Sequence, residues 1–167
     1  MNKAPSKKWR LAGLKALETK RRNERLGAIR TDTHMPAAGA EHYVVAQLMF
    51  RNIDAFKCER SRAGVDIVAA DTRRKTSVSI QVKSRHSHTA TGFLIKTLKA
   101  LFVVFAKLNL TKLGQRSPIC YVLPARVVTA ALKKGARGNW SKCVLTDIKN
   151  PEQYREAWGL IEQALKR

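Results

Sequence analysis

Several polar residues in or beside apolar segments together have the chemistry of a metal-assisted hydrolytic site. Asp66 lies within a run of apolar residues, where a carboxylate is costly to bury unless it is paired or metal-bound. Gln81 and Lys83 are two residues apart in an alternating segment, so they share one face of a strand at about 6–7 Å. An antiparallel pairing of these segments would place Asp66 beside them, and Glu41 could add a second carboxylate.

These residue types suit phosphodiester hydrolysis. Mg²⁺ prefers oxygen ligands and often takes one or two carboxylates, with water and phosphate oxygens filling its other positions. Such an ion polarises the phosphoryl group and acidifies a water molecule, and a nearby Lys83 can hold that water or stabilise the developing charge. The same spacing also fits a simple ion pair of Asp66 with Lys83 at a strand edge, with Gln81 solvated, and the residues alone leave both interpretations open.

The elements that must position these residues follow from the hydrophobic pattern. In one segment Val78, Ile80 and Val82 occupy the strand face opposite Gln81 and Lys83, so this strand has a core side and a site side. The pattern predicts helices over 38–50, 127–134 and 151–165, and strands over 55–59, 64–70, 77–84, 98–108 and 119–123. This order is typical of an α/β or α+β domain built around one sheet.

The charge balance indicates a polyanionic partner. The chain has 167 residues, with 33 Lys and Arg against 12 Asp and Glu, a formal net charge of +21. Neutralisation of phosphates releases counterions and supplies affinity for any nucleic acid. No apolar run of about 18 residues occurs, so the sequence predicts no membrane-spanning helix. An anionic membrane surface is the rival partner, but it normally requires a strongly amphipathic helix with bulky apolar residues on one face, so no membrane partner is expected.

The basic residues predict two parts of the chain. Residues 1–35 are expected to form a basic N-terminal helical arm, and residues 36–167 a separate folded domain. The arm could lie on nucleic acid, and a disordered, solubilising tail explains the same charge run equally well. The residues expected to contact nucleic acid are Lys7, Lys8, Arg10, Lys20, Arg21, Arg22, Arg25, Arg85, Lys133, Lys134 and Arg137.

The cysteines favour a reducing compartment. Cys58, Cys120 and Cys143 are odd in number and form no C-x-x-C pair, so neither a disulfide framework nor a zinc site is predicted. We therefore expect a cytoplasmic, intracellular protein, associated with the nucleoid if its partner is DNA.

A family resemblance is carried by three stretches: Gly39-Ala40-Glu41, Gly64-Val65-Asp66-Ile67-Val68 and Ile80-Gln81-Val82-Lys83. They resemble the PD-(D/E)-x-K, restriction-endonuclease-like nuclease superfamily, over roughly residues 38–130. The resemblance implies that residues 36–167 are a nuclease-like domain, with a restriction-endonuclease-like core in which a mixed central sheet is flanked by helices. It also implies that Glu41 and Asp66 are metal ligands, Gln81 a neutral ligand through its side-chain oxygen, and Lys83 the catalytic lysine. The implied cofactor is Mg²⁺, with Mn²⁺ able to substitute.

Gln81 departs from the family pattern, which usually has Asp or Glu at this position. The loss of one negative charge weakens the attraction for a second Mg²⁺, so a one-metal site is expected. Some homing endonucleases and related members of the superfamily also carry Gln there. The second carboxylate of the site is then supplied by Glu41.

The sequence thus predicts a Mg²⁺-dependent DNA endonuclease of the homing-endonuclease or junction-resolvase type. Cutting both strands requires two active sites, so a homodimer or higher homo-oligomer is expected. Two alternatives stay open: a non-catalytic nucleic-acid-binding protein with a decayed site at Gln81, and an RNA-cleaving toxin of the same fold. Backbone contacts do not distinguish DNA from RNA, so an RNA partner is not excluded.

Overall fold

The computed structural model describes residues 17–18, 34–58, 64–73, 75–87, 89–110, 117–134 and 139–166. The chain divides into two units, Met1–Asp32 and Thr33–Arg167, and each is taken by itself. Apart from Leu17 and Glu18, the predicted basic arm lies outside the described residues up to Thr33, and its helical character stays a prediction.

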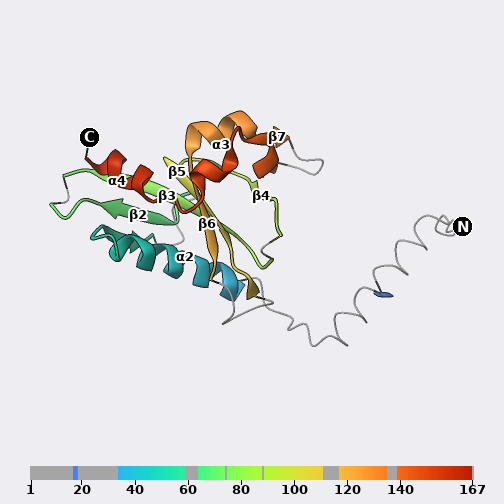
Figure 1. The fold of residues 1–167 in the computed structure, drawn as a ribbon, viewed down its shortest axis with the longest axis horizontal. Coiled ribbons are helices and arrows are strands. Elements are labelled where there is room, and N and C mark those ends of the chain that lie inside the picture. Colours follow the sequence, from blue (N-terminus) through green and yellow to red (C-terminus); the bar gives the residue numbers. More distant parts are fainter. Residues whose placement is uncertain are drawn as a thin grey trace, which may run out of the picture. The chain divides into compact units, whose positions relative to one another are not determined.

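The second unit mixes helices and strands, coloured along the chain in Figure 1. The helices are α2 (His34–Met49), α3 (Ala125–Ala131) and α4 (Gly159–Leu165), with short 3₁₀ turns η2 (Leu145–Asp147) and η3 (Pro151–Tyr154). The strands are β1 (Asp54–Lys57), β2 (Ile67–Ala70), β3 (Ser77–Arg85), β4 (Gly92–Ile95), β5 (Phe102–Lys107), β6 (Ile119–Pro124), β7 (Lys133–Lys134) and β8 (Ser141–Val144).

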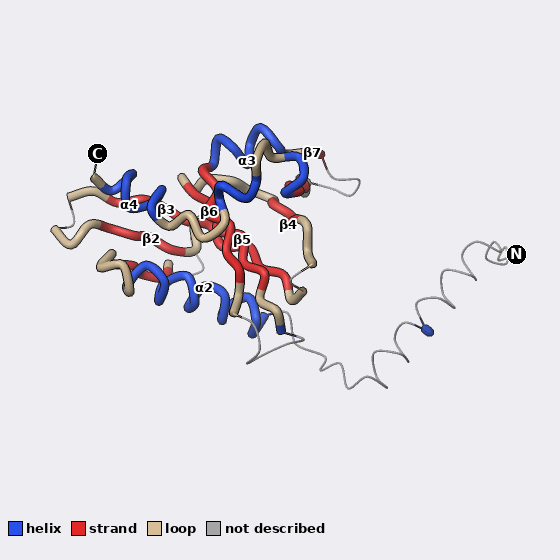
Figure 2. Tube along the Cα trace, viewed as in Figure 1, coloured by secondary structure: helices blue, strands red, loops and turns tan. Residues whose placement is uncertain are grey.

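A five-stranded mixed sheet organises this unit, in the order β1-β2-β3-β5-β6. Only the central pair, β3 with β5, runs parallel, and the other neighbours in this sheet are antiparallel. Ile80 of β3 lies opposite Ile67 on one side and Phe102 on the other. The predicted mixed central sheet flanked by helices is confirmed, and Figure 2 shows the strands between helical segments.

Each face of this sheet packs against its own hydrophobic core. In β5, Phe102, Val104 and Ala106 join the core beneath α2 and α4, while Val103 and Phe105 join the core beneath α3, β4 and β8. Figure 1 shows α2 and α3 on opposite sides of the sheet. A strand buried on both faces has no polar alternation, which is why this segment reads as a continuous apolar run.

A second, smaller sheet in the order β4-β8-β7 was not predicted. The predicted helix over 127–134 is too long by three residues, because Leu132 is in extended backbone and ends α3 at Ala131. Lys133 then pairs with Lys142 of β8, so it belongs to a strand. These strands have only two to four residues and show no long alternation, so local sequence periodicity cannot reveal them.

The prediction of one closing helix over 151–165 is also wrong. The segment is divided between η3 and α4, where Arg155 forms a bridge with Tyr121 of the edge strand β6. Next to it, the N–H of Glu156 donates to the carbonyl oxygen of Cys120 at 2.7 Å. Glu156 has a φ of 50°, a left-handed conformation that cannot continue a helix. The hydrogen-bonding groups of the edge strand thus interrupt the helix.

Helix α2 begins at His34, four residues before the predicted start. Pro36 falls in its first turn, where the missing N–H removes no hydrogen bond, so the proline is tolerated. Ala40, Val44 and Leu48 form its buried stripe against the sheet. In the described part of the chain, no helix is long and apolar enough to cross a membrane.

Candidate active site

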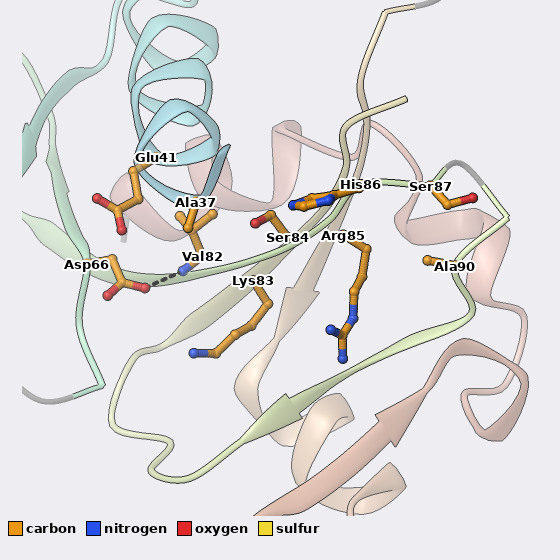
Figure 3. A pocket seen from close by; sticks show the side chains of 10 residues that line it. All are labelled: Ala37, Glu41, Asp66, Val82, Lys83, Ser84, Arg85, His86, Ser87 and Ala90. Atoms are coloured by element: carbon orange, nitrogen blue, oxygen red, sulfur yellow. Dashed lines mark hydrogen bonds between the residues drawn. The ribbon is translucent and has the colours of Figure 1, made fainter. Parts of the chain in front are cut away.

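Three of the four predicted catalytic residues meet in one pocket at the carboxyl end of β3 (Figure 3). The pocket has a volume of about 620 Å³. It is lined by Ala37, Glu41, Asp66, Val82, Lys83, Ser84, Arg85, His86, Ser87 and Ala90. Its walls come from α2, from the residue before β2, and from the end of β3 with the turn that follows it. The fold therefore brings together side chains that lie more than forty positions apart in the sequence.

Asp66 is held by hydrogen bonds on both sides. It directly precedes β2 instead of lying within it, as the sequence had predicted. Its N–H donates to the carbonyl oxygen of Ile80 at 2.9 Å, and its carbonyl oxygen accepts the N–H of Cys58 at 2.8 Å. The carboxylate oxygen Oδ2 accepts the N–H of Val82 at 2.7 Å. These bonds fix the carboxyl group against the backbone of β3.

The surroundings of Asp66 disfavour its negative charge. Burial raises its pKa above the ordinary value, and the nearby charge of Glu41 raises it further. The hydrogen bond from Val82 and the charges of Lys83 and Lys57 act in the opposite direction without cancelling the effect of burial. A carboxylate in this position is stabilised by a bound cation or by a proton.

Glu41 is held by a residue that the sequence analysis missed. The Nζ of Lys57, on β1, lies 2.9 Å from Oε2 of Glu41, and both side chains are partly buried. The same ammonium is 3.5 Å from Nε2 of His42. No local signal points to Lys57, because its role depends on the packing of β1 beside α2.

Gln81 is the buried member of the set. It is 4% exposed, and its Oε1 is buried without a hydrogen-bond partner among the described residues. It does not line the pocket, but it shares the strand face of Lys83. It also lies next to Asp66, because Ile67 is opposite Ile80 in the antiparallel pair. An unpaired buried carbonyl oxygen is rare in folded proteins and calls for an explanation.

The available donors fit a hard cation. The described residues include no group of three or more His, Cys, Asp and Glu side chains that could hold a metal ion. The candidate donors are instead the carboxylates of Glu41 and Asp66 and the unpaired amide oxygen of Gln81. All three are oxygen donors, the type that Mg²⁺ prefers, and Mg²⁺ usually keeps several waters beside one or two carboxylates.

The residues predicted to bind nucleic acid are distributed over several places. Arg85 lines the pocket, and its Nε–H donates to the carbonyl oxygen of Gly92 at 3.3 Å. Lys133 and Lys134 are exposed on β7, where Lys133 forms an ion pair of 2.8 Å with Asp147. The others lie outside the described residues: Lys7, Lys8, Arg10, Lys20, Arg21, Arg22, Arg25 and Arg137.

This mixed sheet, with helices on both faces and a site at the end of β3, has the restriction-endonuclease-like nuclease fold. The chain is similar in structure to I-Ssp6803I, a bacterial homing endonuclease, with 19% sequence identity, a TM-score of 0.53, and coverage of 80% of this chain and 95% of that chain. It is also similar to Hjc, a Holliday junction resolvase of Archaeoglobus fulgidus, with 14% identity, a TM-score of 0.43, and coverage of 68% and 87%.

Comparison with protein-family models finds no matching family, and comparison with curated proteins finds no matching sequence. The fold implied by the resemblance to PD-(D/E)-x-K nucleases is nevertheless confirmed by the structural similarity to I-Ssp6803I.

Proposed function

We propose that this protein is a Mg²⁺-dependent endonuclease that hydrolyses phosphodiester bonds of DNA. The observation that carries the proposal is the meeting of Glu41, Asp66 and Lys83 in one pocket, with the unpaired Oε1 of Gln81 buried beside them. The nuclease fold supports the proposal, since its known members include a homing endonuclease.

Glu41, Asp66 and Gln81 would hold the Mg²⁺, and Mn²⁺ would replace it. When bound, the ion would polarise a phosphoryl oxygen and lower the pKa of a water. Lys83 extends along the same wall of the pocket as Asp66, where its ammonium would hold the attacking water or stabilise charge on the phosphate (Figure 3). Lys57 would keep Glu41 in position before the metal binds.

The charge of the site favours one metal. Glu41 and Asp66 contribute two negative charges, and Lys57 and Lys83 offset them, whereas Gln81 is neutral. A second Mg²⁺ would meet little remaining negative charge from the protein. We therefore infer a single Mg²⁺, with the substrate phosphate supplying further oxygens.

The expected substrate is bound largely through its phosphates. The net charge of +21 and the exposed Lys133 and Lys134 support sequence-independent contacts with the DNA backbone.

Cleavage of both strands of a duplex, or of a branched junction, requires two copies of the pocket, so a homodimer is proposed. Sedimentation with and without DNA tests this state, and a persistent monomer on DNA would favour nicking. A DNA substrate also implies a cytoplasmic, nucleoid-associated protein.

A nuclease assay tests the proposal directly. Duplex DNA, branched DNA, single-stranded DNA and RNA are each incubated with the protein in Mg²⁺ or in EDTA. We expect cleavage in Mg²⁺ alone, lost in Asp66→Asn and in Lys83→Ala while DNA binding is largely kept. Lys166→Ala, a lysine exposed at the end of α4, removes the same charge away from the pocket and should cut like the wild type.

The same assay separates the alternatives. Undiminished cutting by Asp66→Asn and Lys83→Ala would refute the assignment of the site. Salt-dependent binding without hydrolysis of any substrate would identify a non-catalytic nucleic-acid-binding protein. Cleavage confined to RNA, with growth arrest on expression, would identify an RNA-cleaving toxin.

A further inference from the structure

The pocket extends well beyond the groups that the proposed reaction uses. Among the described residues that line it, the carboxylates are those of Glu41 and Asp66, and both lie at one end (Figure 3). At the other end it is lined by Arg85 and His86, whose side chains can donate hydrogen bonds, and by Ser87, whose hydroxyl lies 2.7 Å from that of Thr89. A pocket that is acidic at one end and rich in donors at the other is suited to a ligand with an anion beyond the reacting group.

At the end of the pocket that is rich in hydrogen-bond donors, residues 85–86 are fixed by hydrogen bonds to two neighbouring segments. The carbonyl oxygen of Arg85 accepts the N–H of Leu108 at 2.8 Å, and that of His86 accepts the N–H of Leu110 at 3.0 Å. These bonds continue the pairing of β3 with β5 past the end of the sheet. On the other side, the Nε–H of Arg85 donates to the carbonyl oxygen of Gly92, the first residue of β4. The guanidinium is therefore positioned before any ligand binds, which reduces the entropy lost on binding.

The spacing along β3 matches a nucleic-acid backbone. Lys83 and Arg85 are two residues apart on the same strand, so their side chains leave the same face at about 6–7 Å. This separation is comparable to that of successive phosphates in one strand. The planar guanidinium, with its several N–H donors, also matches the geometry of a phosphate better than a lysine does.

We propose that Arg85, with His86 beside it, forms a second phosphate subsite, which binds the phosphate next to the one that Lys83 contacts. This inference rests on the proposed function, since it takes a polynucleotide strand as the ligand. The other basic residues are expected to contact phosphates at unspecified positions. Arg85 is instead assigned to one particular phosphate, at a fixed distance from the phosphate that reacts.

Binding of two small ligands tests the subsite without any cleavage. Thymidine 3′,5′-bisphosphate carries two phosphates and thymidine 5′-monophosphate one, and neither contains a phosphodiester bond. Isothermal titration calorimetry with the full chain in Mg²⁺ should show that the wild type binds the bisphosphate at least roughly tenfold more tightly, as expected for an added hydrogen bond between charged groups. Arg85→Ala should lose this advantage, and Arg85→Lys should keep part of it.

The matched control is Arg73→Ala. Arg73 is exposed in the turn before β3, so this variant loses the same charge at the opposite end of the same strand. The inference is overturned if the wild type binds both ligands equally, if Arg85→Ala keeps the advantage, or if Arg73→Ala loses as much. Thermal unfolding of each variant checks that the fold is intact.

The result is independent of the cleavage assay. If no nucleic acid is cleaved and the bisphosphate advantage still depends on Arg85, the nuclease proposal fails and the phosphate subsite stands. If DNA is cleaved but the advantage is absent, the subsite fails and the nuclease proposal stands.

Discussion

The charge of Asp66 is required for the proposed metal binding, but burial of that charge destabilises the fold. Two substitutions at Asp66 distinguish the effect on activity from the effect on stability. Asp66→Asn removes the charge and keeps an oxygen that can accept the N–H of Val82, whereas Asp66→Ala removes both. Both variants should lose Mg²⁺-dependent cleavage under the proposed mechanism. Their stabilities should differ from each other and from that of the wild type.

The difference between the two variants follows from one hydrogen bond. Val82 is 8% exposed, and its N–H donates to Oδ2 of Asp66 at 2.7 Å. A buried N–H left without a partner costs about 1–3 kcal/mol, so Asp66→Ala should be less stable than Asp66→Asn by that amount. For a domain of this size, the expected difference in midpoint temperature is roughly 3–10 °C.

The comparison of the wild type with Asp66→Asn depends on pH. Because burial raises the pKa of Asp66 above 3.8, the native state binds its proton more tightly than the unfolded chain does. The stability that this group contributes is present below pH 3.8 and is lost as the pH rises through the raised pKa. Asp66→Asn lacks this titration and should be more stable than the wild type at neutral pH.

Urea unfolding at a series of pH values measures these effects in metal-free buffer. Adding Mg²⁺ should then stabilise the wild type, by about 2.7 kcal/mol at a hundred times its dissociation constant, and leave Asp66→Asn unchanged. If Asp66→Asn is less stable than the wild type at pH 7 in EDTA, the electrostatic reasoning is wrong. If Mg²⁺ stabilises both proteins equally, Asp66 is not a ligand.

Two further substitutions test other contacts, and a third serves as a control. Gln81→Glu adds a carboxylate beside Asp66 and should tighten Mg²⁺ binding roughly tenfold in a calorimetric titration; unchanged affinity would remove Gln81 from the ligand set. Glu156→Ala should destabilise the fold by about 1–3 kcal/mol in urea, because its carboxylate accepts the N–H of Cys120 at 2.6 Å and the indole N–H of Trp158 at 2.9 Å; an unaltered unfolding midpoint would contradict this. Gln163→Ala, a truncation of an exposed side chain in α4, is the control for it.

The central strand and the unusual environment of Asp66 could be predicted from local sequence. The alternation of apolar and polar residues over 77–84 indicates a strand with Gln81 and Lys83 on one face, and β3 has that arrangement. The isolated carboxylate of Asp66 within an apolar run indicates a special environment, and its raised pKa agrees. A strand pattern of period two survives in any tertiary context in which one face is buried.

The boundaries that failed depend on hydrogen bonds between distant segments. Tyr154, Trp158, Ile161 and Leu165 are spaced as one helical face, yet Tyr154 packs against one core and the other three against the second. The break arises at Glu156, where the edge of β6 takes the backbone hydrogen bonds. Nothing within the segment itself encodes that partner.

The sequence by itself determined the charge of +21, the polar face of β3 and the set of carboxylate, amide and basic residues from which the site is proposed. Only the tertiary structure decided that Lys57 pairs with Glu41, that Gln81 is buried without a partner, and that Arg85 is anchored at the far end of the pocket. The physical reason is the sequence separation over which each effect acts. Periodicity and residue type reflect interactions within a few positions of the chain, whereas ion pairing and desolvation depend on distant residues that the fold brings together.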